Sequence, residues 1–359
     1  MPPGLKDVAA RAGVSIKTAS NVVNGYVHVA PETRARVQAA IDALGYVPNP
    51  AARRLRGGGS GVIALAVPEL RSPYFAELAG HVVETAAPRG WTVLIEQTGG
   101  RGNRERDLVA GLRRHAIDGI VLCPVGLATG ELTRRHGIPA VLLGDWTRGV
   151  PGPPRRPEDQ VPVAAQARHG PVDHVGIDSA AAAAEATRHL LRLGRRRIAA
   201  IGASGRPDAM PRPQRLAGYR AALAGAGLVP DPLLAVAVRG QGRSHGAAAI
   251  EELLARGADF DAVFCFTDLL ALGAMRALYE HGVDVPGDVA VIGFSNIEEG
   301  RYSTPTLSTI DPDTKRIAEI AVDMLAERLT GNAAAIAPRE IRVEHRLLAR
   351  ESTLGRPQL

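Results

Sequence analysis

The sequence of 359 residues contains only two cysteines, and each stands alone in an apolar run: Cys123 in GIVLCP and Cys265 in AVFCF. Two isolated cysteines form neither a disulfide-rich scaffold nor a zinc site with paired spacing. We therefore expect both to be buried strand residues. His169 and His174 lack a partner cysteine or an acidic cluster, so the sequence predicts no metal site.

Long hydrophobic segments are also absent. No run of about 18 uninterrupted apolar residues occurs, which argues against a membrane span. The first residues, MPPGLKDVAARAG, lack the basic and then apolar order of a signal peptide. A composition that is 45% hydrophobic and 22% charged is typical of globular proteins. We expect a cytoplasmic protein with no membrane partner.

Sequence motifs of common enzymes are missing as well. The apolar run VIALAV continues into PELRSPYF without the glycine pattern of a dinucleotide-binding turn or a phosphate-binding loop. The stretch GQGRSHG breaks that pattern at His245, and neither HExxH nor GxSxG occurs. The sequence thus predicts a protein that is not an enzyme and needs no cofactor.

Positive charge is concentrated near the amino terminus. The formal net charge is +6, and residues 1–60 contain eight basic and only three acidic side chains, so the rest is nearly neutral. A small basic segment before a nearly neutral body is typical of a module that binds a polyanion. The alternative is a solvated surface on which charges cluster by chance.

Three short helices are predicted in this basic segment. The first, in LKDVAARAG, ends at Gly13, which suits a left-handed stop. Ser15 can cap a second helix over about 16–24, and Pro31 suits the first position of a third, which stops at Gly45. The residues expected in one small core are Val8, Ala9, Ala12, Ala19, Val22, Val23, Val37, Ala40, Ile41 and Leu44. This order predicts a helix-turn-helix.

The second helix carries groups that suit DNA on its exposed face. The amino-terminal end of a recognition helix reaches base edges in the major groove. Ile16 suits a thymine methyl group, Lys17 a guanine edge or a phosphate, and Asn21 an adenine edge. The residues predicted to contact DNA here are Ser15, Ile16, Lys17, Thr18, Ser20, Asn21 and Asn24. The alternative is a helical bundle with a polar surface.

Residues 48–60 form a second candidate DNA contact. NPAARRLR contains good helix-forming residues, but a helix of about seven residues is unstable alone. Leu55 lies among arginines with no apolar face to bury it, which suits insertion into the minor groove. The contacts predicted in this hinge are Asn49, Ala52, Arg53 and Leu55. A plain flexible linker is the alternative.

The stretch LKDVAARAGVS, with KT, VVNG and then VAPETRARVQAAIDALGYVPNPAARRL, carries a family resemblance. Residues 5–56 resemble the DNA-binding head and hinge of LacI/GalR-type transcriptional regulators. The resemblance implies a recognition helix in the major groove, paired hinge helices of a dimer in the minor groove, and a leucine lever at Leu55. Many members have Val-Ser-Arg where this chain has Ala19, Ser20 and Asn21, so the operator sequence does not carry over.

From Gly61 onward, apolar runs alternate with amphipathic helices. The runs predicted as a first set of strands are 62–67, 91–96, 118–123 and 139–144. The runs predicted as a second set are 174–178, 197–202, 233–238, 261–266 and 288–294. Such alternation predicts two lobes with parallel sheets covered on both faces. Ligands of such sheets bind beyond the carboxyl ends of the strands.

The predicted organisation therefore has three parts. Residues 1–47 form a small all-α helix-turn-helix head, and residues 48–60 form the hinge helix and linker. Residues 61–359 form an α/β bilobed body with two parallel sheets, and the family resemblance implies that this body is periplasmic-binding-protein-like, binds the effector and dimerises. The segment 146–174, rich in Pro, Arg and Gly, is predicted to be an exposed loop that covers the effector or is an irrelevant insertion.

The stretches GYRAAL, FTDLLALGAMRALYEHGVDVP and DVAVIGFSNIEEGRYSTPTLSTI resemble the effector-binding body of the same family. The resemblance implies that Arg215 binds effector hydroxyls or carboxylates, which suits its fork of donors. Thr267 stands where many members have asparagine, and Ser295 and Asn296 stand where many have two aspartates. The usual carboxylate clamp on a sugar is therefore missing. Asp268 either contacts the ligand or caps the helix that it begins.

Further candidates for the effector site follow other strands. Tyr74 and Phe75 either stack on a ligand ring or pack in the core. The full set predicted to bind the effector is Glu69, Ser72, Tyr74, Phe75, Asp145, Arg215, Gln241, Thr267, Asp268 and Ser295.

The sequence as a whole predicts a DNA-binding transcriptional regulator. The simplest form is a repressor that binds a pseudo-palindromic double-stranded operator as a homodimer, under control of a sugar or related metabolite. The carboxyl end lacks a leucine heptad repeat, which favours a dimer over a tetramer. The alternatives are a solute-binding protein of a transport system, and a corepressor-dependent or activating regulator whose effector is a nucleoside or purine.

Overall fold

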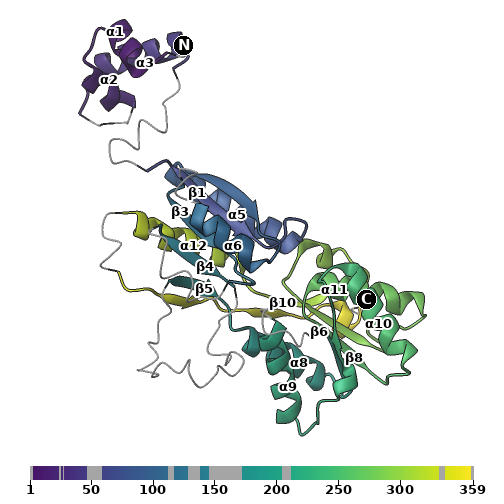
Figure 1. The fold of residues 1–359 in the computed structure, drawn as a ribbon. Coiled ribbons are helices and arrows are strands. Elements are labelled where there is room, and N and C mark those ends of the chain that lie inside the picture. The colour runs from purple at the N-terminus through teal and green to yellow at the C-terminus, as the bar shows by residue number, and fades with distance from the viewer. Residues whose placement is uncertain are drawn as a thin grey trace, which may run out of the picture. The chain divides into compact units, whose positions relative to one another are not determined.

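The computed structural model describes residues 3–23, 26, 28–46, 59–111, 117–127, 138–144, 172–203, 212–330 and 336–356. The chain divides into two compact units, Met1–Gly61 and Val62–Leu359 (Figure 1). Each unit has its own hydrophobic core, and each is described separately below. The predicted hinge contacts at Asn49, Ala52, Arg53 and Leu55 lie outside the described residues, as do Asn24 and Asp145.

The first unit contains three helices. Their bounds are α1 Leu5–Ala12, α2 Ile16–Val23 and α3 Pro31–Leu44. One residue from each, Val8, Ala19 and Val37, is fully buried in a shared core, which confirms the predicted packing. Val23 was predicted in this core but is only half-buried and lies outside the cluster. Val23 follows the core residue Val22 by one position, so its side chain points about 100° around the helix from that of Val22.

Two glycines end the helices of this unit as predicted. Gly13 follows α1 with a φ of 63° and Gly45 follows α3 with a φ of 58°, both in the left-handed region that glycine adopts without steric cost. Arg36 of α3 donates to the carbonyl of Ala12 from Nη2, at 2.9 Å, and from Nε, at 3.2 Å. This cation satisfies a carbonyl at the end of α1 and so holds α3 against the turn before α2.

The second unit contains two six-stranded sheets. The first has the order β11-β5-β4-β3-β1-β2 and the second the order β12-β10-β9-β8-β6-β7. Strands of the first sheet are β1 Val62–Val67, β2 Thr92–Gln97, β3 Gly119–Leu122, β4 Ala140–Leu143, β5 Asp173–Gly176 and β11 Glu340–Arg342. Strands of the second are β6 Ile198–Ala203, β7 Ala235–Ala237, β8 Ala262–Cys265, β9 Ala290–Phe294, β10 Ser308–Asp311 and β12 Arg346–Leu348. All pairings are parallel except β10 with β12.

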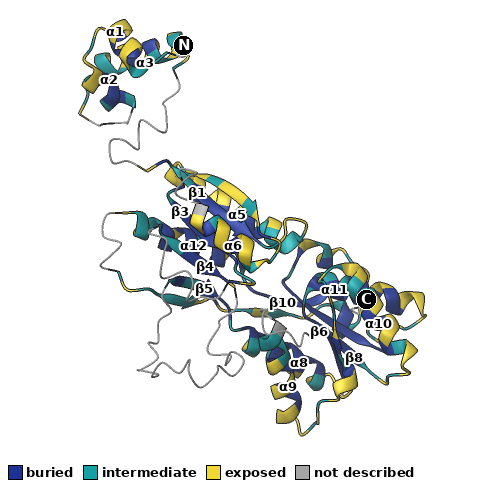
Figure 2. Cartoon of the chain, in the orientation of Figure 1, coloured by how far each residue is buried: buried dark blue, intermediate teal, exposed yellow. Residues whose placement is uncertain are grey.

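Helices cover both faces of each sheet, because the strands are apolar on both sides (Figure 2). The α-helices of this unit are α5 Pro73–Ala86, α6 Gly102–Gly111, α8 Ser179–Arg192, α9 Arg212–Gly225, α10 Arg243–Ala255, α11 Asp268–Glu280, α12 Thr314–Leu329 and α13 Glu351–Leu354. Short 3-10 helices are η1 Ala87–Arg89, η3 Pro232–Leu234 and η4 Glu298–Arg301. None of the described helices has the length and apolar character needed to cross a membrane.

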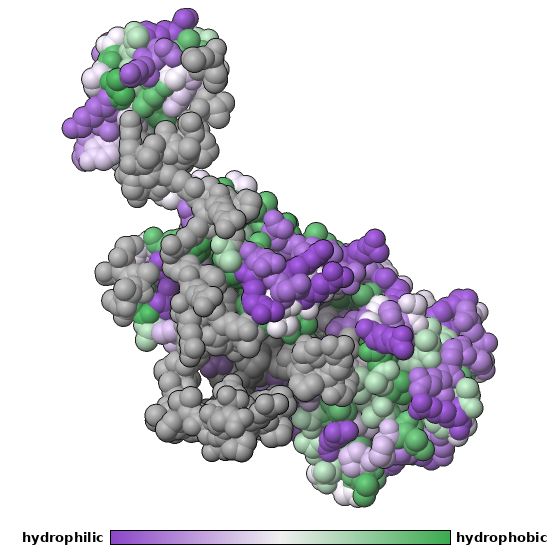
Figure 3. All heavy atoms as spheres, viewed as in Figure 1, coloured by the Kyte–Doolittle hydropathy of each residue, from purple (hydrophilic) through white to green (hydrophobic). Residues whose placement is uncertain are grey.

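Successive side chains of β6 show how the second sheet is covered. Ile198 and Ala200 pack with α8 and α9, while Ala199 and Ile201 pack with α10 and α11. In the first sheet, α5 and α12 cover one face and α6 the other. The outer side of α6 is hydrophilic, as the surface over this helix shows (Figure 3).

The strand at Asp173–Gly176 corrects the prediction about the two lobes. It was assigned to the second set of strands, but it pairs with β4 and β11 in the first sheet. Three strands, β10, β11 and β12, were not predicted at all. The chain therefore passes between the lobes three times: after β5, between β10 and α12, and between β11 and β12.

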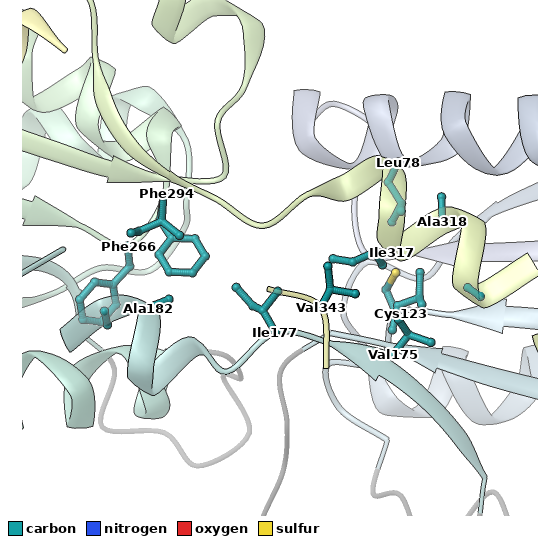
Figure 4. Close-up of a cluster of buried hydrophobic side chains, with 14 of the residues drawn as sticks. Leu78, Cys123, Val175, Ile177, Ala182, Phe266, Phe294, Ile317, Ala318 and Val343 are labelled. Carbon is teal, nitrogen blue, oxygen red and sulfur yellow. The ribbon is translucent and has the colours of Figure 1, made fainter. Parts of the chain in front are cut away.

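One hydrophobic cluster runs through these crossings. It extends from Leu78 in the first lobe, through Ile177 and Val343 on the crossing segments, to Phe266 and Phe294 in the second lobe (Figure 4). The backbone N–H of Val343 donates to the carbonyl of Gly176 at 2.8 Å, so two of the crossings lie side by side. These crossing segments therefore join the two lobes, and a small change in their backbone angles can move one lobe against the other.

Candidate DNA-binding and effector sites

The α2 helix presents a polar face above its buried one. The Oγ of Ser15 accepts from the backbone N–H of Thr18 at 3.1 Å, which confirms the predicted amino-terminal cap. Ile16, 42% exposed, and Lys17 are accessible on the first turn, with Asn21 half-buried one turn later. This end of the helix presents unpaired backbone N–H groups and a cation, which together suit an anionic partner.

Ser20 does not belong to that exposed face. It was predicted to contact phosphate, but its side chain is only 8% exposed, so it is buried, as Ala19 and Val22 are. The exposed members of the predicted set within the described residues are Ser15, Ile16 and Lys17, with Thr18 and Asn21 half-buried.

A cavity of about 1430 Å³ lies in the second unit and is lined by residues of both lobes. The nine effector candidates that the structure describes all line it: Glu69, Ser72, Tyr74, Phe75, Arg215, Gln241, Thr267, Asp268 and Ser295. They come from loops that follow parallel strands and from the starts of helices, where the chain leaves the sheet. The topology thus brings together side chains up to 226 positions apart in the sequence.

Two aromatic residues begin α5 at the edge of the cavity. The rings of Tyr74 and Phe75 lie edge to face, with centroids 5.1 Å apart and an interplanar angle of 71°. Phe75 also packs against the large core cluster, whereas Tyr74 does not belong to that cluster. Phe75 thus combines cavity lining with core packing, while Tyr74 lines the cavity outside this cluster.

Arg215 lies on the opposite lobe at the start of α9. Its guanidinium stacks 3.6 Å from the centroid of the Phe294 ring, and its Nη1 donates to the carbonyl of Phe266. The end of β9 thus supplies the flat apolar ring of Phe294, and the residue after β8 supplies the carbonyl of Phe266 as an acceptor. These contacts hold the guanidinium plane in one orientation at the cavity wall, as a bidentate donor requires.

The sequence offered two roles for Asp268, helix capping or ligand contact, and the capping role belongs to Thr267. Thr267 is the cap of α11, because its Oγ1 accepts from the N–H of Leu270 at 3.2 Å. Asp268 therefore does not cap the helix. Its carboxylate is 1% exposed and accepts from the Oγ1 of Thr309 at 2.6 Å and the N–H of Ile297 at 2.9 Å.

The segment after β9 has an unusual backbone. Ser295 has a φ of 130° and Asn296 a φ of 53°, in the region that residues with a side chain rarely adopt. The Oδ1 of Asn296 accepts from Nη2 of Arg350 at 2.7 Å, which points its amide into the protein. Ser295, 9% exposed, lies at the cavity wall. The loop is shaped by internal bonds and offers a hydroxyl to a ligand.

Comparison with known proteins identifies the family of this chain. Residues 4–49 match the model of bacterial regulatory proteins of the lacI family, and residues 187–353 match a periplasmic binding protein-like domain. The HTH-type transcriptional regulator CelR of Thermobifida fusca is 35% identical over 358 residues, 98% of each chain. This chain belongs to the LacI family. It is therefore a DNA-binding transcriptional regulator with a small-molecule-binding body.

Solved structures of LacI-family proteins show the same architecture. One is described as a complex of CelR with cellobiose; it is 31% identical, with a TM-score of 0.68 over 98% of this chain and 99% of that one. Another is the lac repressor dimer bound to operator and an anti-inducer, 25% identical, with a TM-score of 0.80 over 99% and 100% of the two chains. The transport-protein alternative is not favoured.

Several cavity residues of this LacI-family chain were missed from the sequence. They are Arg71, Gln97, His174, Arg239 and Arg243. Arg71, Gln97 and Arg239 lie at or just after the ends of β1, β2 and β7, so the rule that picked the other candidates could have found them. His174 lies within β5, and Arg243 begins α10. Burial lowers the pKa of His174 to about 4 and so favours a neutral ring at the cavity wall.

The cavity wall also contains a cysteine, Cys123. Burial raises the pKa of Cys123 to about 12, so this cavity residue stays a neutral thiol. Within the described ranges, no group of three or more His, Cys, Asp or Glu side chains gathers as metal ligands would.

Proposed function

We propose that this LacI-family regulator is a repressor whose affinity for its operator is set by a sugar or related small molecule bound between the lobes. The observation that carries the proposal is that all nine described effector candidates, from both lobes, line one cavity. The similarity to a protein solved in complex with cellobiose supports a sugar as the class of effector. A ligand in contact with both lobes couples its binding energy to their relative position.

For the DNA-binding half, we propose that residues 1–47 act as the head, 48–60 as the hinge and 61–359 as the sensing and dimerising body. Ile16, Lys17 and Asn21 read base edges, because they occupy the first two turns of α2. Ser15 and Thr18 contact phosphates. From the sequence alone, Asn49, Ala52, Arg53 and Leu55 complete the contacts through the minor groove.

A homodimer is the proposed assembly, as in the lac repressor structure that this chain resembles. Apolar side chains are exposed on the first lobe: Leu94 and Ile95 of the edge strand β2 and Val83 of α5, each more than a third exposed. An edge strand with apolar side chains is normally covered in a soluble protein. Two heads held together in this way would bind the two halves of a pseudo-palindromic operator.

The proposal is tested in two steps with the full chain. First, bound duplexes are selected from a random pool, and the affinity for the selected sequence is measured by fluorescence anisotropy against a scrambled duplex. We expect a preference of about a thousandfold or more at physiological salt. Second, sugars such as cellobiose are added; one of them is expected to lower the operator affinity about 5- to 150-fold. A chain with no sequence preference, or an affinity that no ligand changes, would contradict the proposal.

A further inference from the structure

Arginine side chains from both lobes gather at the cavity. Arg71 follows β1 in the first lobe, and Arg215, Arg239 and Arg243 come from the second lobe. Carboxylates are fewer, since the only acidic residues among the described cavity residues are Glu69 and Asp268. The lining residues that the structure describes therefore carry more positive than negative charge.

The acidic partners remove only part of this excess. Arg243 forms an ion pair with Glu299 at 3.1 Å. Asp268 also lines the cavity, but its carboxylate is buried and already accepts hydrogen bonds from Thr309 and Ile297. Among the described lining residues, Glu69 is therefore the exposed carboxylate.

Arg71 and Arg239 contribute to the excess of positive charge at the cavity. Both are exposed, and within the described parts of the chain neither forms an ion pair with a carboxylate. A cleft with walls of low dielectric constant focuses the field of such charges on its interior. An anion that enters is thus attracted before it makes any contact.

The chemistry of the guanidinium group narrows the ligand. Its planar fork of N–H donors matches a carboxylate or phosphate group, and bonds of this kind are about twice as strong as those between neutral groups. A neutral sugar hydroxyl uses one donor at a time and leaves the charge uncompensated. The hydroxyl of Ser295, which also lines the cavity, is neutral and adds no negative charge that would repel an anion.

We infer that the effector is an acidic sugar derivative whose anionic group is bound by Arg71 and Arg239, while its ring lies between Tyr74 and Arg215. This inference rests on the proposed function and specifies its ligand. It also gives the ligand a means to act, because Arg71 belongs to one lobe and Arg239 to the other. Like charges oppose closure of the cleft, and an anion between them reverses that effect.

The test uses matched pairs of ligands and isothermal titration calorimetry on the full chain. The pairs are cellobiose with cellobionic acid, and glucose with glucuronic acid and with glucose 6-phosphate. We expect the acidic member of at least one pair to bind about tenfold or more tightly than the neutral one, as a charge-assisted hydrogen bond predicts. The ratio should fall as salt is raised. The carboxylate and phosphate arms show which anion the site accepts.

Variants connect the result to the two arginines. Arg71→Gln and Arg239→Gln should each reduce the ratio of acidic to neutral binding about tenfold, with thermal melting unchanged because both side chains are exposed. Arg188→Gln, an exposed substitution on α8 away from the cavity, is the matched control and should leave the ratio unchanged.

Two outcomes would overturn the inference. One is that neutral members bind as tightly as the acidic ones, or that no acidic member binds. The other is that the two cavity variants behave like the control. If cellobiose alone binds and releases the operator, the proposed function stands and only the inference about charge fails. If no duplex is preferred, the function itself fails, whatever the sugars do.

Discussion

The carboxylate of Asp268 accepts a 2.6 Å hydrogen bond from the hydroxyl of Thr309, and this contact joins the start of α11 to β10 beside the cavity. The second carboxylate oxygen accepts from the N–H of Ile297 at 2.9 Å. Burial raises the pKa of Asp268 to about 6, although these hydrogen bonds and Arg350 act in the opposite direction. The side chain therefore joins three segments and also makes the stability of this lobe sensitive to pH.

Replacing this residue by Asp268→Asn should change how stability depends on pH. The raised pKa means that the folded chain binds the proton more tightly than the unfolded one, whose carboxyl titrates near 3.8. The contribution of Asp268 to the free energy of unfolding is thus largest at low pH and is lost as pH rises to about 6. Its slope reaches about 1.4 kcal/mol per pH unit.

Urea denaturation of the wild-type and Asp268→Asn proteins across this pH range measures the effect. The difference between their free energies of unfolding should change with pH and level off above about 6. Two parallel pH profiles would show that the carboxyl does not titrate in this range.

Arg328→Ala should destabilise the first lobe strongly. Its Nε and Nη2 each donate to the carboxylate of Asp173 at 2.8 Å, and Asp173 is only 1% exposed. Removing Arg328 leaves the buried carboxylate with only the longer 3.9 Å ion pair to Arg339, and breaking a buried pair costs up to about 3–5 kcal/mol. Arg316→Ala is the control, because Arg316 pairs with Glu319 at the surface and should contribute less than about 1 kcal/mol. Equal losses of melting temperature in both variants would contradict the prediction.

Glu105→Ala should loosen the cavity wall opposite Arg215. The carboxylate of Glu105, fully buried on α6, accepts from the N–H groups of Val125 at 3.0 Å, Gly126 at 3.1 Å and Leu127 at 2.8 Å. Without it, three backbone donors lose their acceptor, and each unsatisfied donor costs about 1–3 kcal/mol.

The matched variant Glu105→Gln keeps one acceptor oxygen and should lose less stability. Val125 and Leu127 line the cavity, so both variants should also bind the effector less tightly, in the same order. Chemical denaturation measures the stability and calorimetry the binding. Unchanged binding in a destabilised Glu105→Ala protein would show that this wall does not contribute to recognition.

Lys17→Ala and Asn21→Ala should change which DNA sequences the head prefers. Each side chain lies on the first two turns of α2, and a good base contact is worth about 1–3 kcal/mol of discrimination. Selection from a random duplex pool should therefore give a relaxed preference at one operator position for each variant. Lys315→Ala, which removes a basic side chain from α12 of the body, serves as the control for the change in net charge. A selected sequence identical to that of the wild-type chain would argue against base reading by these residues.

The sequence determined most of the local structure. Helical spacing, Ser15 and the two glycine stops placed α1, α2 and α3 within one residue, because capping and left-handed stops depend on neighbouring residues. Apolar runs located nine strands for the same reason. The candidates at strand ends proved to share one cavity, since parallel strands with helical crossovers bring their carboxyl ends to one edge.

Only the tertiary structure decided the rest. The sheet to which β5 belongs, the three crossings between lobes and the strands β11 and β12 depend on pairing between distant segments, which no local pattern encodes. Ser20, predicted to be exposed, is buried, and Val23, predicted to be in the core, is only half-buried. Asp268 has a structural role through its hydrogen bond with Thr309, 41 positions away. The positive charge at the cavity likewise arises from arginines of two lobes, which become neighbours of one ligand only after the chain has folded.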